Sequence, residues 1–244
     1  MATFMRLSTT PRSPLCRPPI AGLLLYLFFA LSPSTVSSGP LTASSNDCAA
    51  LTTPGDTVTT ILKTGTETLR LTFPRPYLVP LAFRDGATRD AVTFAINANS
   101  YLPLGDGESR AAVDAAPLKD TVLLMATLIR SDLRQSALEE FAKLQAMVHH
   151  PDTVVSLAPI SVPGLVSPKQ DSVSSKELFF QFEGTALRGV ISCSKVEAVK
   201  FPHCKHVTVV GPLLLDIGYS RSLLPQWRQI SKHSERLAQC FMST

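Results

Sequence analysis

The stretch Val207-Thr-Val-Val-Gly-Pro-Leu-Leu-Leu-Asp-Ile-Gly-Tyr219 decides the fold of this chain. Two apolar runs flank Gly211-Pro212, a dipeptide that marks turns, so the stretch predicts a β-hairpin. The two runs before it, residues 178–182 and 187–193, predict a further pair of strands with a short connection. Strands joined by short turns pair in the antiparallel sense, because a parallel pair needs a long crossover. The C-terminal half therefore predicts an antiparallel sheet.

Three segments upstream predict further strands. Residues 67–73 alternate apolar and polar side chains with a period of two, and residues 91–96 form a short apolar run. Residues 121–129 are almost continuously apolar, which fits a buried strand and also, through positions 118, 122, 125 and 129, one face of a helix. The short length of this run and the polar break at Arg130 favour a strand.

Two further segments predict helices. Ser131 or Asp132 suits the N-cap of a helix over about 132–148, and Pro225 suits the first turn of a helix over about 225–241. The side chains expected to face the sheet are Leu133, Ala137, Leu138, Phe141, Leu144, Met147 and Val148 in the first helix and Trp227, Ile230, Leu237 and Phe241 in the second. The prediction is an α+β fold, a mostly antiparallel sheet with one inserted helix and one C-terminal helix packed on it as a single layer.

The first 38 residues have the features of an export leader. They carry three arginines and no acidic residue, and an apolar run covers residues 20–31. Val36 and Ser38 suit cleavage before Gly39, which predicts a signal peptide. An uncleaved membrane anchor over residues 20–36 is the alternative, although this run is shorter than the ~20 residues that span a bilayer. In both cases the rest of the chain is predicted to lie outside the cytoplasm.

The remainder of the chain predicts one domain. Residues 39–66 are rich in Ser, Thr and Gly and predict a loosely structured N-terminal segment, followed by a single α+β domain over 67–244. Within it, residues 151–176 contain four prolines and six serines and predict a mobile loop. The chain has 23 basic and 19 acidic residues, and subtracting the three leader arginines leaves 20 against 19. No basic surface for nucleic acid is therefore expected.

Five cysteines occur in the chain, and cleavage of the leader would remove Cys16. An even number of cysteines in an exported chain favours two disulfides. Three pairings are open, and the favoured one joins Cys193 to Cys204 on neighbouring strands and Cys48 to Cys240. Four reduced, buried thiols are the alternative.

The same region contains the donor atoms of a zinc site, in Cys193, His203, Cys204 and His206. A free thiol beside a histidine would also be a candidate nucleophile. The spacing of these residues is unlike that of known zinc sites, and a disulfide would consume both thiols. The interpretation favoured here is a disulfide with bystander histidines.

Other residues carry weaker signals. His149 and His150 are expected to be solvated at a helix end, and residues 105–108 to form a turn rather than a calcium site. The chain lacks the Gly-x-Ser-x-Gly, Gly-x-Gly-x-x-Gly and Gly-Lys-Ser/Thr motifs, so no cofactor is predicted. Trp, Tyr and Arg are favoured at the centres of interfaces, which makes Tyr219, Arg221 and Trp227 the candidate interface residues. The favoured alternative is that Trp227 packs on the sheet and Arg221 lies at the start of the C-terminal helix.

Two stretches carry a resemblance to a known group of proteins. One is Phe73-Pro-Arg-Pro-Tyr-Leu78 with the strand at 91–96, and the other runs from Cys193 through Phe201-Pro-His-Cys-x-His206 to Tyr219-x-Arg-x-x-Leu-Leu-Pro-x-Trp227. Together they resemble uncharacterised exported or membrane-anchored proteins of Gram-negative bacteria, over roughly half of the mature chain. The resemblance implies an envelope location and brings no activity or site residue with it.

These features predict an exported, disulfide-stapled, non-catalytic binding or accessory domain of the bacterial cell envelope. Its location would be periplasmic or extracellular, and its partner an envelope protein. A membrane-anchored subunit of an envelope complex is the second hypothesis. A small hydrolase or metal-dependent enzyme that uses Cys193, His203, Cys204 and His206 is the third.

Overall fold

The structure is a computed structural model that describes Cys48 and residues 56–79, 85–104, 119–150, 156–169 and 172–242. The predicted leader and the predicted turn at 105–108 lie outside the described residues. The strands are β1 (Thr57–Thr64), β2 (Glu67–Pro74), β3 (Thr88–Arg89), β4 (Ala91–Asn97), β5 (Thr121–Leu128), β6 (Leu157–Pro159), β7 (Leu165–Pro168), β8 (Lys176–Glu183), β9 (Ala186–Ser194), β10 (His203–Val210) and β11 (Leu213–Ser220). The α-helices of the described residues are α3 (Ala137–His149) and α4 (Trp227–Met242). Short 3-10 helices are η1 (Arg75–Tyr77), η2 (Ser131–Leu133) and η3 (Arg221–Gln226).

The large sheet has the strand order β4-β5-β11-β10-β9-β8-β7-β6, and every pair in it is antiparallel. The predicted hairpin is β10–β11, in which Val210 pairs with Leu213 across the turn. Gly211 has a φ of +55° there, a conformation that glycine adopts without strain. The apolar run at 121–129 forms strand β5, as predicted. A second sheet has the order β2-β1-β3, and the predicted α+β class is confirmed.

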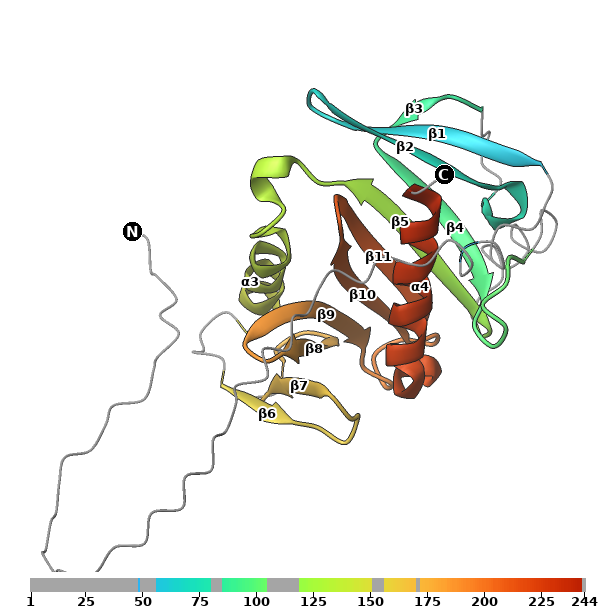
Figure 1. Cartoon of the computed structure of the whole chain (residues 1–244). Coiled ribbons are helices and arrows are strands. Elements are labelled where there is room, and N and C mark those ends of the chain that lie inside the picture. Colours follow the sequence, from blue (N-terminus) through green and yellow to red (C-terminus); the bar gives the residue numbers. More distant parts are fainter. Residues whose placement is uncertain are drawn as a thin grey trace, which may run out of the picture. The chain divides into compact units, whose positions relative to one another are not determined.

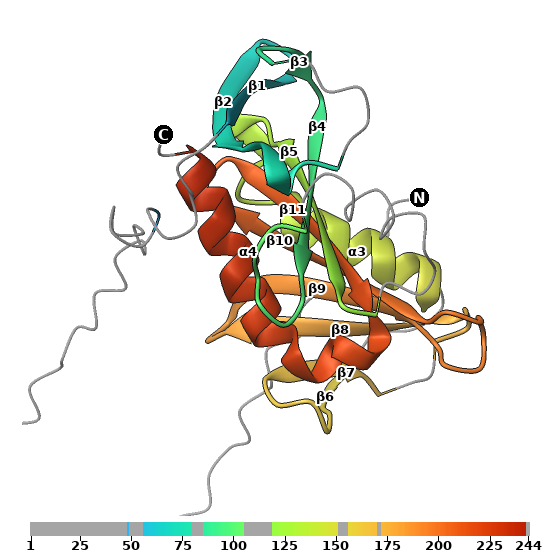
Figure 2. The same ribbon diagram turned by 90° about the vertical axis from the view of Figure 1, so that its right-hand side faces the viewer.

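The two helices pack on opposite faces of the large sheet, α4 on one and α3 on the other (Figures 1 and 2). Side chains alternate between the faces of a strand, and in β10 Cys204 and Val210 join the core under α4 whereas Val207 packs beside α3. The expectation of one helical layer is therefore wrong. Both faces of the central strands are apolar, so each face needs its own cover.

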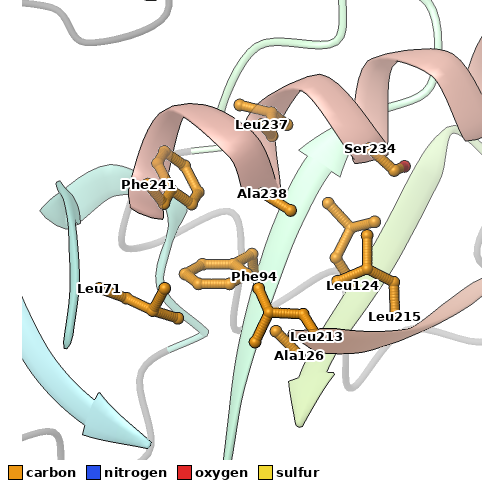
Figure 3. Close-up of a pocket in the computed structure, with 10 residues that line it drawn as sticks. All are labelled: Leu71, Phe94, Leu124, Ala126, Leu213, Leu215, Ser234, Leu237, Ala238 and Phe241. Atoms are coloured by element: carbon orange, nitrogen blue, oxygen red, sulfur yellow. The ribbon is translucent and has the colours of Figure 1, made fainter. Parts of the chain in front are cut away.

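The main core lies between α4, the small sheet and strands β4, β5 and β11. Phe241 of α4 is its aromatic centre, with ring centroids 5.5 Å from Phe73, 5.3 Å from Tyr77 and 5.1 Å from Phe94. A void of about 10 Å³ lies beside it. Figure 3 shows its lining residues, which are apolar except for Ser234. A void of this size and polarity does not hold an ordered ligand, so it belongs to the packing of the core.

Two segments are more regular than predicted. The prediction of a loosely structured segment at 39–66 is wrong over β1. A strand is favoured there by the β-branched residues Thr57, Val58, Thr59, Thr60 and Ile61, and Val58 and Leu62 are buried. The prediction of a mobile loop at 151–176 is wrong over the two strands β6 and β7. These two strands extend the large sheet beyond β8, with Leu165 buried and the hydroxyl of Ser167 donating to the carbonyl of Leu178 at 2.9 Å.

The first helix differs in its start and in its buried face. Residues 131–133 form η2, and α3 begins only at Ala137 with Ser136 as its N-cap residue. The face that packs on the sheet is formed by Leu138, Phe141, Ala142 and Ala146. The predicted core residues Leu144, Met147 and Val148 are 58%, 64% and 64% exposed. The helix has two apolar stripes, and the sheet covers the one that contains Leu138 and Phe141.

Candidate functional site

The four cysteines of the predicted mature chain form two disulfides, paired as favoured from the sequence. Cys193 and Cys204 lie directly opposite each other on β9 and β10, with Cα atoms 4.0 Å apart. Cys48 is joined to Cys240 near the end of α4, with Cα atoms 5.3 Å apart and a sequence separation of 192. Both bridges remove thiols that a metal or a nucleophilic mechanism would need.

The candidate cluster of Cys193, His203, Cys204 and His206 is not assembled. The two histidines lie three positions apart on β10, so their side chains point to opposite faces of the sheet. His203 is exposed whereas His206 is completely buried. In the part of the chain that the structure describes, no group of three His, Cys, Asp or Glu side chains is placed to hold a metal ion. The enzyme hypothesis that rests on this cluster is therefore contradicted.

The expectation of solvated histidines at the end of α3 is wrong. His149 and His150 are only 5% and 4% exposed. Residues 172–176 cover this helix end, where Val173 N–H donates to the carbonyl of His149 and the Nδ1 of His149 lies 2.6 Å from the hydroxyl of Ser174. Burial, together with the positive charge of Lys176, lowers the pKa of His149.

The candidate interface residues Tyr219, Arg221 and Trp227 do not form a surface patch. Tyr219 is completely buried and Trp227 is 3% exposed. Arg221 is used inside the molecule, where its guanidinium donates to the carbonyl of Ser194 at 2.7 Å and forms an ion pair with Glu177. The structure uses these side chains inside the domain, because large aromatic rings and side chains with several hydrogen-bond donors suit domain cores as well as interfaces.

The structure instead forms a groove of about 380 Å³ between the first half of α4 and the ends of the strands beside it. Five of its residues are spaced along α4 at the intervals of one helix face, and the other four come from the β6–β7 turn and the end of β8. Its lining consists of Gly164, Gln181, Phe182, Glu183, Trp227, Arg228, Ser231, Lys232 and Glu235.

The wall of the groove near Gly164 is built by the first two residues of α4. The indole N–H of Trp227 donates to the carbonyl of Pro163 at 3.3 Å. The guanidinium of Arg228 lies 5.4 Å from the centroid of the Trp227 ring and directly against Gly164. A Cβ at position 164 would come within 1.9 Å of an Arg228 nitrogen, and Gly164 has a φ of +83°. The positive φ favours glycine in this turn, and the Arg228 guanidinium occupies the space where a Cβ would stand.

The groove carries charges of both signs. Arg228 and Lys232 are exposed along its helix edge, and Glu183 is paired with Arg188 on the strand side at 2.7 Å. Glu235 accepts a hydrogen bond from the hydroxyl of Ser231 at 2.6 Å, and partial burial raises the pKa of its carboxyl group. The groove thus places cationic hydrogen-bond donors and carboxylate acceptors around the exposed ring of Phe182. A surface of this composition suits polar segments of another molecule.

His206 lies behind this groove as an uncharged group. Its ring is 6.1 Å from that of Trp227, and neither ring nitrogen has a hydrogen-bond partner among the described residues. Burial lowers the pKa of His206 to about 4. A Cβ at Gly189 would lie 2.7 Å from its Nε2, so the imidazole fills the space that the glycine leaves.

We expect His206 to make the protein less stable as the pH falls. Because its pKa is near 4 when folded and near 6.5 when unfolded, the unfolded chain binds the additional proton between these values. Full protonation would lower the free energy of unfolding by about 3 kcal/mol, and about 2 kcal/mol of this decrease falls between pH 7 and pH 5. Urea unfolding of wild type and His206→Phe at both pH values measures it.

The other histidines with lowered pKa values, His149, His150 and His233, are present in both proteins and cancel in this comparison. A pH dependence that is equal in wild type and His206→Phe would contradict the assignment.

The fold is similar to two solved structures. One is an immunity protein of the Stenotrophomonas maltophilia type IV secretion system, with a TM-score of 0.55 and 15% identity over 77% of this chain and 95% of that one. The other is the iron-regulated outer membrane lipoprotein of Neisseria meningitidis, with a TM-score of 0.48 and 10% identity over 77% and 93% of the two chains. No protein family model matches the chain, and no curated protein sequence matches it.

At 15% identity the likeness to the immunity protein shows a shared fold. Fold and site together define the class of this protein as a disulfide-bridged α+β domain with a mixed-charge groove. Within the described residues no helix is long and apolar enough to cross a membrane. The predicted anchor at 20–36 lies outside those residues.

Proposed function

We propose that the protein is an exported, non-catalytic binding domain of the bacterial cell envelope. The pair of disulfides carries this proposal, because it includes every cysteine of the predicted mature chain. Disulfides persist in the periplasm and outside the cell and are rare in the cytoplasm, where thiols are kept reduced. The basic and apolar leader supports the same compartment.

The groove along α4 is the proposed binding surface. It is rigidly built, because Trp227 ties the β6–β7 turn to the start of the helix and Arg228 packs against Gly164. Arg228 and Lys232 offer exposed cationic donors beside the exposed ring of Phe182. An aromatic surface with donors at its rim suits a segment of a partner protein that carries carboxylate groups.

The compartment is tested by the intact mass of the protein recovered from its host, with and without reduction and alkylation. We expect a mass that begins near Gly39, with four thiols that become alkylated only after reduction. A full-length mass with disulfides intact would favour the membrane-anchored subunit instead. Free thiols in the native protein would contradict both forms of the proposal.

The groove is tested by photo-crosslinking in the living host, with a photoreactive residue placed at Phe182. We expect a crosslinked protein adduct that is lost when Arg228→Glu and Lys232→Glu are added. Leu102 is 51% exposed and outside the groove, so the same reactive residue at position 102 is the matched control. Equal adducts from both positions, or an adduct from 182 that survives the charge reversals, would contradict the groove as the binding surface.

A further inference from the structure

A second surface of the domain combines exposed apolar side chains with lysines. The loop between β9 and β10 exposes Val196, Val199 and Phe201 by 61%, 39% and 39%. Val173, beside it, is 74% exposed, and Met147 and Val148 of α3 are 64% exposed each. We call these six residues, together with Lys195 and Lys200, the basic apolar surface.

Hydrogen bonds join the three segments of this surface. Val173 N–H donates to the carbonyl of His149 at 3.0 Å, which places residue 173 at the end of α3. The backbone N–H of Lys195 donates to the carbonyl of Ser175 at 2.7 Å, and its ammonium group donates to the carbonyl of Ser172 at 3.0 Å. The end of α3, residues 172–175 and the base of the β9–β10 loop therefore lie side by side. Figure 2 shows α3 and this loop reaching toward the same side.

The loop is held open rather than free to fold onto the domain. The Cys193–Cys204 disulfide closes its base across the two strands. Arg221 is hydrogen-bonded to both ends of the loop. The Arg221 guanidinium donates to the carbonyl of Ser194, and the Arg221 backbone N–H donates to the carbonyl of Pro202. Its apolar side chains are thus presented to the outside, in a conformation that need not be ordered again on binding.

The chemistry of the surface fits lipid better than protein. Centres of protein interfaces are enriched in Trp, Tyr and Arg and depleted in Lys. Here the apolar residues are aliphatic except for Phe201, and the ammonium group of Lys200 lies 5.2 Å from the centroid of that ring. In the described part of this region the lysines are Lys176, Lys195 and Lys200. Of the glutamates near them, Glu177 is paired with Arg221 and Glu140 with Lys143, which leaves Glu197. Aliphatic and aromatic side chains among lysines are what contact an anionic lipid surface.

We propose that the basic apolar surface docks the domain on an anionic phospholipid bilayer, with the β9–β10 loop entering the headgroup region. This contact is separate from the groove and does not rest on the groove's partner. It is separate, too, from any anchoring by residues 20–36. The apolar side chains would leave water, and the exposed Lys200 would meet lipid phosphates.

The test uses the protein as recovered from its host and vesicles of phosphatidylglycerol with phosphatidylcholine, some carrying brominated acyl chains. The natural chain has a single tryptophan, Trp227, which is buried. Phe201→Trp adds an indole at the loop, and Leu102→Trp adds one at an exposed position elsewhere. We expect a blue shift and quenching by brominated lipid for the indole at 201 and none for the one at 102.

Two further variants examine the charge and the apolar contribution. Lys200→Glu is expected to weaken the quenching of the indole at 201. In protein that lacks the leader, the double variant Val199→Ser, Phe201→Ser is expected to reduce partition to the vesicles by about tenfold or more. Since quenching reports the position of the introduced indole, it distinguishes loop contact from binding through residues 20–36. An indole at 201 that stays unquenched with anionic vesicles would overturn the proposal, and so would equal quenching at 102.

Discussion

Removal of the Cys48–Cys240 bridge is expected to lower the free energy of unfolding by about 5 kcal/mol. The bridge closes a loop of 192 positions, and the entropy that a cross-link removes from the unfolded chain grows with loop length. Domains of this kind are stable by ~5–15 kcal/mol, so the loss would bring the variant close to unfolding. Urea unfolding of the double variant Cys48→Ala, Cys240→Ala against wild type measures the change.

The second bridge supplies the matched control. Cys193 and Cys204 are only 11 positions apart, so the same relation gives about 3 kcal/mol for the variant Cys193→Ala, Cys204→Ala. The order of the two losses is therefore the sharper expectation. A smaller loss for the long loop than for the short one would show that native-state contacts, rather than chain entropy, determine what each bridge contributes.

Phe241→Ala is expected to lower the free energy of unfolding by about 3–5 kcal/mol. Phe241 is 1% exposed and its ring lies within 5.5 Å of the rings of Phe73, Tyr77 and Phe94, measured between centroids. These partners come from β2, η1 and β4, so the truncation leaves a cavity where the small sheet, the large sheet and α4 meet.

The control for this prediction is Phe201→Ala in the β9–β10 loop. Phe201 is 39% exposed, and its truncation should cost less than about 1 kcal/mol in urea unfolding. If the two phenylalanines gave similar losses, the core under α4 would not be the principal source of stability.

The strands were predictable because their signals are local. Alternation in 67–73 and Gly211-Pro212 between two apolar runs indicate extended chain within a few residues. The apolar run in 121–128 fitted a helix as well, and its short length decided for a strand. The cysteine pairing followed from the same strands. Once β9 and β10 are neighbours, Cys193 and Cys204 face each other, and Cys48 and Cys240 remain.

The groove was not predictable, because its residues come from segments distant in sequence. Gly164, Gln181 and Arg228 meet only when the β6–β7 turn docks on α4. A cue existed in Gly164, a glycine between two short apolar runs, but the proline and serine content of 151–176 favoured a mobile loop. The burial of His149, His150 and His206 depends in the same way on which segment covers them.

Hydrophobic periodicity and cysteine number thus determine the class of fold, the strands and the bridges of this protein, since each reflects contacts between near neighbours or between paired strands. The side of the sheet that each helix covers, the buried stripe of α3 and the groove at α4 depend on long-range packing. Leu144 and Leu138 are equally apolar, and only the shape of the β8–β9–β10 face selects Leu138 for burial. Local sequence specifies what a segment can bury, and the complementarity of distant surfaces selects what it does bury.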